Sequence, residues 1–111
     1  MKYILSLMSM LIAFSFIAIQ PAFAVEKVTE TTIKTTAQCE MCKSRIEKNL
    51  NKVDGILKAD LDLTTKKVTV KFDETKVSKV EIRNIISKIG YDADDVQKDM
   101  RAYKKLPKCC Q

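Results

Sequence analysis

The chain has 111 residues, with 20 Lys and Arg against 14 Asp and Glu, a formal net charge of +6 and no histidine. The lack of histidine excludes Cys/His zinc sites, histidine-based copper sites and Cys/His catalytic pairs. The charges are dispersed, without a run of five or more of one sign. This favours a solvated surface, and we expect no nucleic-acid partner.

The first 24 residues have the pattern of a secretory signal peptide. Lys2 precedes an apolar stretch over residues 4–19, and Ala22-Phe23-Ala24 supplies an A-x-A cleavage site. The alternative is an uncleaved membrane anchor, but the apolar stretch is shorter than the ~20 residues that span a bilayer. We therefore expect cleavage after Ala24 and an exported protein, periplasmic or secreted.

The next segments predict a strand, a helix and a hairpin. Residues 25–36, rich in Thr and Val, predict the first strand. Apolar residues at i, i+4 and i+7 predict a helix over about residues 40–53, which ends at the turn signal Asp54-Gly55. Alternating apolar and polar residues then predict two paired strands over residues 57–63 and 68–72. The inward residues expected in the first of them are Leu57, Ala59, Leu61 and Leu63.

A second helix and a last strand complete the pattern. Ser78-Lys79-Val80-Glu81 fits a capping box, which Val77 and Ile82 flank as a hydrophobic staple. The helix has an apolar stripe and ends at Gly90, and residues 91–96 predict a short, acidic edge strand. The order β-α-β-β-α-β predicts an α+β, ferredoxin-like sandwich with a four-stranded antiparallel sheet and two helices on one face.

Residues 97–111 form an addition to this pattern. Val96, Met100, Tyr103 and Leu106 have helical spacing, with Asp94 or Asp95 as the expected N-cap. Pro107 ends the predicted helix before Lys108-Cys109-Cys110-Gln111. We therefore divide the chain into a signal peptide (1–24), a domain (25–96) and a C-terminal helical tail ending in Cys-Cys (97–111).

The four cysteines occur as two pairs, Cys39 with Cys42 and Cys109 with Cys110. Neither pair brackets a long loop as a structural disulfide framework does. Cys39 and Cys42 stand where the first predicted helix begins, and free N–H groups and the helix dipole favour thiolates there. Such a pair can bind Cu(I), Hg(II) or Zn(II), or it can form a redox disulfide.

Three segments occur together at characteristic intervals: Cys39-Glu40-Met41-Cys42, Val53-Asp54-Gly55-Ile56 and Ile89-Gly90-Tyr91-Asp92-Ala93. With these segments the sequence resembles the heavy-metal-associated domain family over about residues 30–96. That family includes copper chaperones, modules of copper-transporting P-type ATPases and the periplasmic mercuric-ion-binding protein. The resemblance implies that Cys39 and Cys42 bind the metal and that Tyr91 packs near the metal loop.

The chain departs from the family just before the first cysteine. Where the family usually has Gly-Met-x, this sequence has Thr36-Ala37-Gln38, so Ala37 replaces a buried methionine that supports the loop. Met41, between the cysteines, is near the predicted site. We interpret it as a packing residue of the first helical turn and not as a thioether ligand.

The leading interpretation is a non-enzymatic carrier that captures and transfers a soft metal ion, with Cu(I) expected and Hg(II) or Zn(II) as alternatives. Its partners would be the ion and a membrane metal transporter or another thiol-site acceptor. We expect a monomer, with a metal-bridged dimer as the alternative. The second interpretation is a thiol–disulfide redox protein, since C-x-x-C at a helix start is also the thioredoxin device. An RNA-binding module is disfavoured because Phe72 is the only aromatic residue of the central hairpin.

The lengths of the last elements suggest a role for the second cysteine pair. A helix over residues 97–106 would travel back by ~15 Å, and a five-residue strand covers ~16 Å in the other direction. The tail would then bring Cys109 and Cys110 beside Cys39 and Cys42. We hypothesise that it supplies a third and a fourth thiolate ligand. The alternatives are a tail with incidental thiols, or a disulfide from the tail to Cys39 or Cys42.

Overall fold

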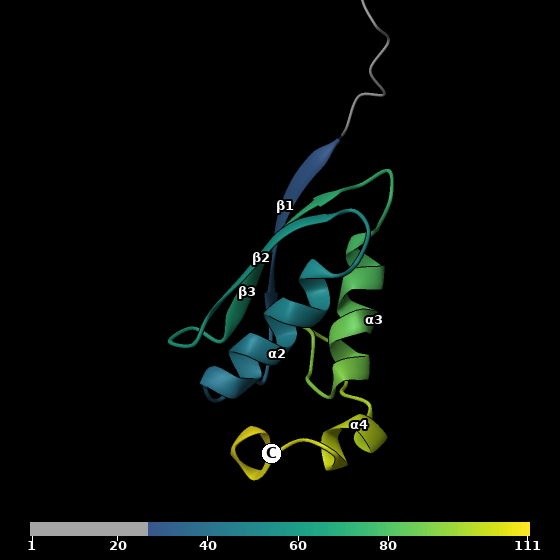
Figure 1. Cartoon of the computed structure of the whole chain (residues 1–111). Helices are drawn as coiled ribbons and strands as arrows, with labels where there is room; N and C mark the ends of the chain where they lie inside the picture. Colours follow the sequence, from purple (N-terminus) through teal and green to yellow (C-terminus); the bar gives the residue numbers. More distant parts are fainter. Residues whose placement is uncertain (1–26) are drawn as a thin grey trace, which may run out of the picture.

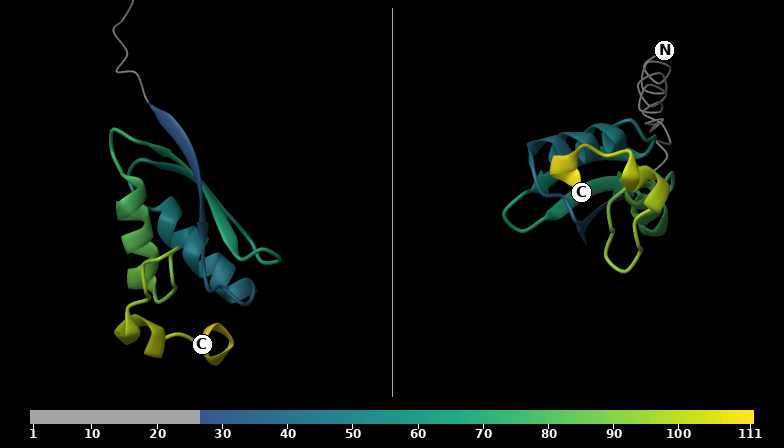
Figure 2. Two further views of the ribbon diagram at one scale, coloured as in Figure 1. Left: turned by 180° about the vertical axis from the view of Figure 1, so that it is seen from behind. Right: turned by 90° about the horizontal axis from the view of Figure 1, so that it is seen from below.

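The computed structural model describes residues 27–111, so the predicted signal peptide lies outside the described residues. The described part of the chain forms a three-stranded antiparallel sheet in the order β1-β3-β2. Two main helices lie on one face of this sheet (Figures 1 and 2). No described helix has the length and apolar character that crossing a membrane requires. The elements are β1 (Val28–Lys34), α2 (Glu40–Asn51), β2 (Ile56–Asp62), β3 (Lys67–Asp73), α3 (Lys79–Ile89), α4 (Met100–Lys104) and the 3-10 turn η1 (Lys108–Cys110).

Helix α2 begins directly after Cys39 and buries one face against the sheet. Cys42, Ile46 and Leu50 follow one another at i, i+4 and i+8, and all three are completely buried. Polar side chains of α2 also bond to β2. Leu61 donates its backbone N–H to Glu47 Oε2 at 3.2 Å, and Ala59 donates to Asn51 Oδ1 at the same distance. Helix α2 is therefore fixed along β2, one of the two edge strands of the described sheet.

The register of β2 differs from the prediction at its first residues. Its pairing with β3 is irregular between Ile56 and Lys58, where one extra residue interrupts the alternation. Ile56 therefore points inward, and Leu57, which was predicted to face the core, is 55% exposed. Beyond the irregularity the prediction is confirmed, because Ala59 and Leu61 are buried.

Helix α3 has the predicted start and end. Glu81 donates its backbone N–H to the Ser78 hydroxyl at 3.1 Å, and the flanking Val77 and Ile82 are both buried. At the other end, Gly90 has a φ of 115°, a conformation that side-chain-bearing residues rarely adopt. The chain can therefore turn sharply at Gly90 and continue past the end of α3.

Residues 91–96 do not form the predicted fourth strand. Asp94 has a φ of 52°, so the backbone folds into a turn in which Ala93 and Val96 exchange two hydrogen bonds of 2.9 Å. Among the described residues, a single isolated bridge, between Thr35 and Ala93, joins this segment to the residue after β1 where an edge strand was predicted. The predicted α+β class with two main helices is confirmed, and the described sheet has three strands instead of four.

The tail helix is shorter than predicted and begins later. Helix α4 has five residues, and Asp99 caps it by accepting the Arg101 N–H at 2.9 Å. The predicted caps, Asp94 and Asp95, are wrong because the turn after α3 contains them. From α4 the tail crosses one end of the domain to reach the start of α2 (Figure 2, right).

Two glycine substitutions test how the fold holds the tail. A Cβ at Gly90 would lie 3.0 Å from Leu106 Cδ1, and one at Gly55 would lie 2.7 Å from Lys76 Cβ. Because both glycines have positive φ, we expect Gly90→Ala and Gly55→Ala each to lower the free energy of unfolding by ~1–3 kcal/mol. Only Gly90→Ala should displace the tail, so that Cys110 of the reduced protein is alkylated faster. Equal alkylation rates in the two variants would contradict this.

Candidate metal centre

Threonine hydroxyls fix the loop that precedes the first cysteine. The Thr35 hydroxyl donates to the Lys66 carbonyl at 2.9 Å and accepts the Ala37 N–H at 3.2 Å. The Thr36 hydroxyl accepts the Asp92 N–H at 3.1 Å, which ties the loop to the segment after α3. Ala37 is completely buried, as expected for the position of the family's methionine. Hydrogen bonds of the two threonines thus hold the loop directly before a small buried residue.

Cys39 and Cys42 take different positions at the start of α2. Cys39 is the N-cap residue and is partly exposed, whereas Cys42 is completely buried. Their Sγ atoms lie 3.4 Å apart. The Cys39 thiol donates to the Cys109 sulfur at 3.2 Å. The nearby backbone N–H of Cys42, and then Cys109, stabilise the Cys39 thiolate and lower the pKa of the Cys39 thiol. The pair therefore has one sulfur open to exchange and one anchored in the core.

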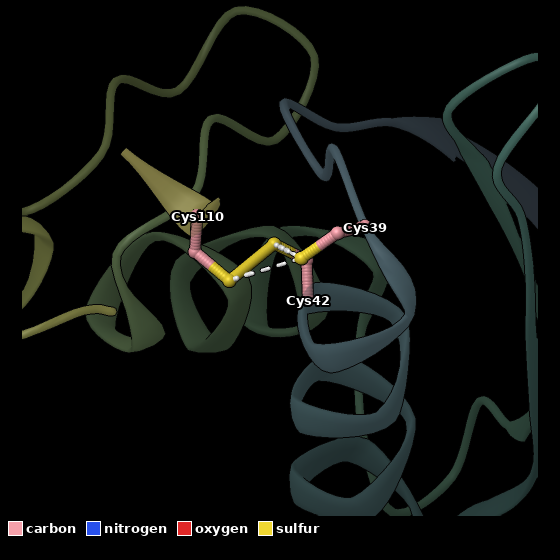
Figure 3. Close-up of side chains that lie close together, drawn as sticks. All are labelled: Cys39, Cys42 and Cys110. Atoms are coloured by element: carbon pink, nitrogen blue, oxygen red, sulfur yellow. Dashed lines mark hydrogen bonds between the residues drawn. A yellow bond between two sulfur atoms is a disulfide. The ribbon is translucent and has the colours of Figure 1, made fainter. Parts of the chain in front are cut away.

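The structure brings the second cysteine pair to the first, and Figure 3 shows Cys110 beside Cys39 and Cys42. A disulfide joins Cys42 to Cys110, with a Cα–Cα distance of 5.9 Å. The Sγ of Cys39 lies 3.2 Å from that of Cys109 and 3.6 Å from that of Cys110. The predicted juxtaposition is present, although the predicted strand and long helix are not. Of the alternatives left open by the sequence, the tail disulfide to Cys42 is the one in this structure.

Contacts of other residues also hold the tail. Leu106 is 6% exposed and packs into the core beneath Gly90. The Gln111 carboxamide donates to the carbonyls of Tyr103, Lys104 and Leu106 at 3.2, 3.3 and 2.9 Å. Sequence reasoning missed Gln111, although an amide donor a few residues after a short helix is suited to satisfying the free carbonyls of the helix end.

Met41 does not pack in the core. Its side chain is 52% exposed, and its Sδ accepts a weak hydrogen bond from the Cys109 thiol at 3.7 Å. The interpretation as a packing residue of the first helical turn is therefore wrong. The thioether instead faces the tail, where it adds a fifth sulfur atom beside the cysteines.

Tyr91 and Arg45 lie beneath the cysteines. Tyr91 is completely buried, and this burial raises the pKa of its phenol. Within the described residues, the Tyr91 hydroxyl and Arg45 Nε are buried without a hydrogen-bond partner. The hydrogen bond with Cys39 and burial raise the pKa of the Cys109 thiol, against a smaller opposite effect of the Arg45 charge. Sequence reasoning missed Arg45, although its position three residues after Cys42 places it on the same side of the helix.

Comparison with known proteins gives the family of this centre. The chain matches the heavy-metal-associated domain over residues 31–92, which is more than half of its length. The chain belongs to the heavy-metal-associated domain family. The tail with Cys109 and Cys110 lies beyond the matched residues of this domain.

The relatives of this heavy-metal-associated domain include copper proteins. It is 43% identical over 74 residues to a copper-exporting P-type ATPase of Staphylococcus aureus (strain Newman), an alignment that spans 63% of this chain and 9% of the ATPase. It is 39% identical over 54 residues to the copper chaperone CopZ of S. aureus (strain JH9), over 49% of this chain and 79% of CopZ. The chain therefore spans only a small part of the ATPase.

Solved structures give the same family. A CopZ metallochaperone superimposes with a TM-score of 0.57 and 32% identity, over 59% of this chain and 98% of that one. Oxidised MerP from Ralstonia metallidurans CH34 gives a TM-score of 0.59 and 25% identity, over 61% and 96%. The predicted membership of the heavy-metal-associated domain family is confirmed.

The disulfide between the domain and its tail leads to a second prediction. It links residues 68 positions apart, so in the chain-entropy description it stabilises the oxidised protein by up to ~4 kcal/mol. Denaturation should give a lower free energy of unfolding with reductant than without it for the wild type and for Cys109→Ser. The double variant Cys42→Ser/Cys110→Ser should not show this difference. Digestion of the oxidised protein should give a Cys42–Cys110 peptide. A Cys39–Cys42 peptide as the main product would contradict the pairing.

Proposed function

We propose that this protein is an exported metal carrier that captures Cu(I) between the thiolates of Cys39 and Cys42. The observation that carries the proposal is the position of these two sulfurs, 3.4 Å apart at the start of α2. Thiolates are the ligands that soft ions such as Cu(I) prefer. The copper chaperone and the copper-exporting ATPase among its relatives support copper as the ion. Hg(II) and Zn(II) are the alternatives, and the similarity to MerP favours testing Hg(II).

Release of the ion would proceed by ligand exchange and not by an enzymatic step. Cys39 is the more exposed of the two ligands, so an incoming thiolate of an acceptor can replace it first. Cys42 is buried and would keep its bond until the acceptor offers a second ligand. Free N–H groups at the start of α2 stabilise the negative charge of the dithiolate complex throughout. The acceptor would be a membrane metal transporter or another protein with a thiol site.

A thiol–disulfide redox protein is the second candidate, and one observation favours it. The Cys39 sulfur lies within 3.6 Å of both sulfurs of the Cys42–Cys110 disulfide, as thiol–disulfide exchange requires. Reduction of insulin disulfides by the protein, together with no binding of Cu(I), would favour this candidate over the carrier.

Anaerobic titration of the reduced protein tests the carrier directly. We expect one Cu(I) per chain in competition with a chelator, and a loss of affinity of more than tenfold, ~1.4 kcal/mol or more, in Cys39→Ser and in Cys42→Ser. Ser44→Ala, on the same helix between these residues and Ile46, is the matched control and should bind as the wild type does. Equal affinities of all four proteins would refute the proposal.

Export is tested separately by the mass of the mature protein. When the full sequence is expressed in a bacterium, the protein recovered from the periplasm or medium should begin at Val25, because Ala22-Phe23-Ala24 fits the cleavage site. Replacement of Ala24 by a bulky residue should cause the uncleaved form to accumulate. An unprocessed chain in the soluble cytosolic fraction would contradict export.

A further inference from the structure

We propose that in the reduced protein Cys109 and Cys110 join Cys39 and Cys42 in a four-thiolate site for a tetrahedral divalent ion of the Zn(II) class. This inference rests on the proposed function for the part played by Cys39 and Cys42. It goes beyond that function, because the two tail thiolates lie outside the residues matched to the family domain. It also concerns an ion with a different coordination number from the proposed Cu(I) cargo.

The distances between the sulfurs fit a tetrahedral ion. Zinc–thiolate bonds of ~2.3 Å in a tetrahedron place neighbouring sulfurs ~3.8 Å apart. The Cys39 sulfur lies 3.2, 3.4 and 3.6 Å from those of Cys109, Cys42 and Cys110, and the sulfurs of Cys109 and Cys110 are 3.8 Å apart. The sulfurs of Cys39, Cys42 and Cys110 all lie within 4.8 Å of one another, and the Cys109 sulfur approaches this group beside Cys39 and Cys110. An ion would move the Cys39 sulfur from its neighbours by a few tenths of an ångström. The sulfurs of Cys42 and Cys110 would move farther apart once their bond is broken, and the Cys109 side chain would turn inward.

The tail is positioned for binding without help from its sulfurs. Gln111 is hydrogen-bonded to three carbonyls around the end of α4, and Leu106 is buried in the core. Cys110 also donates its backbone N–H to the Pro107 carbonyl at 2.8 Å. These hydrogen bonds of Gln111 and Cys110 lie within the tail and keep it folded. The buried Leu106 and the hydrogen bond from the Asp99 N–H to the Ser87 carbonyl attach it to the domain. Because these contacts persist after reduction, ligand binding costs less ordering entropy.

The surroundings suit the charge of such a site. Four thiolates around a divalent ion leave a net charge of −2, which requires compensation in a partly buried position. The N–H groups at the start of α2 supply positive charge on the protein side, and Arg45, three residues after Cys42 on the same helix and with its Nε buried, adds a guanidinium. Cys42 and Cys110, at 0% and 2% exposure, keep water from half of the site, while Cys109 stays exposed on the exchange side.

The disulfide makes the site dependent on reduction. The Cys42–Cys110 bond takes one ligand from each pair, so the oxidised form keeps only Cys39 and Cys109 as thiols. A dithiol reductant breaks that bond by supplying two electrons and two protons, and it is itself converted to a cyclic disulfide. Both cysteines then become thiols, which lose their protons when the ion binds.

The experiment titrates the full mature chain with Co(II), a spectroscopic probe of tetrahedral thiolate sites, and then displaces Co(II) with Zn(II). The reduced protein should give intense visible and sulfur-to-metal bands at one ion per chain. Cys109→Ser/Cys110→Ser should lose these bands and bind Zn(II) at least tenfold more weakly. Lys108→Ala, an exposed neighbour in the same turn, is the matched control and should behave as the wild type does. The oxidised wild type should give no tetrahedral spectrum.

Several outcomes would overturn the proposal. An unchanged Co(II) spectrum and Zn(II) affinity in the double-serine variant would show that the tail supplies no ligand. A spectrum that appears at one ion per two chains, with sedimentation as a dimer, would assign the four thiolates to two C-x-x-C pairs. Circular dichroism establishes that the variant is folded. Retained Cu(I) binding by that variant would leave the proposed carrier function intact, whereas loss of Cu(I) binding in Cys39→Ser and Cys42→Ser tests that function alone.

Discussion

Packing of α2 on the sheet is the interaction on which the site depends. Burial of Cys42, Ile46 and Leu50 along one face fixes the rotation of the helix, and its start at Cys39 fixes its position along the axis. These two constraints together place one cysteine inside the core and the other at its edge. The difference in exposure between two thiols three residues apart therefore follows from helical geometry. An ion held between them would have one ligand that exchanges first and one that exchanges later.

The tail lies at the same end of the domain as the start of α2, but contacts other than those of α2 position it. Gly90 allows the chain to pass under α3, and the turn at Asp94 returns it toward the helices instead of along the sheet. Without that turn, a fourth strand would carry the chain away from α2, and a helix as short as α4 could not bring it back. The turn at Asp94 therefore accounts both for the absence of the fourth strand and for the approach of Cys110 to Cys42.

The sequence was sufficient where a local pattern and the tertiary fold agree. The start of α2, both ends of α3 and the Ser78 cap were predicted, because periodicity and capping residues act within a few positions. The predicted inward direction of Leu57 and the predicted strand over 91–96 were wrong. A β-bulge and a positive φ at a non-glycine residue caused these errors, and neither changes the alternation of apolar and polar residues from which strands are predicted. The approach of the two cysteine pairs was predicted from a fourth strand and a long tail helix. The strand is absent and the helix is shorter, and these two errors in length cancel. Arg45 and Gln111 were missed because their roles exist only once the tail has docked.

The four cysteine sulfurs can serve a disulfide or an ion, and the two uses exclude each other. Cys42 and Cys110 cannot ligate an ion as thiolates while they are bonded to each other. A disulfide that spans 68 positions stabilises the closed tail by restricting the unfolded chain, and an ion bound by the same residues would stabilise it by linkage. Oxidation therefore preserves the docked tail but removes ligands, whereas an ion would preserve both. Because the buried Leu106 holds the tail on the domain in either state, exchange between the two would need rearrangement of the cysteine side chains and not refolding of the domain.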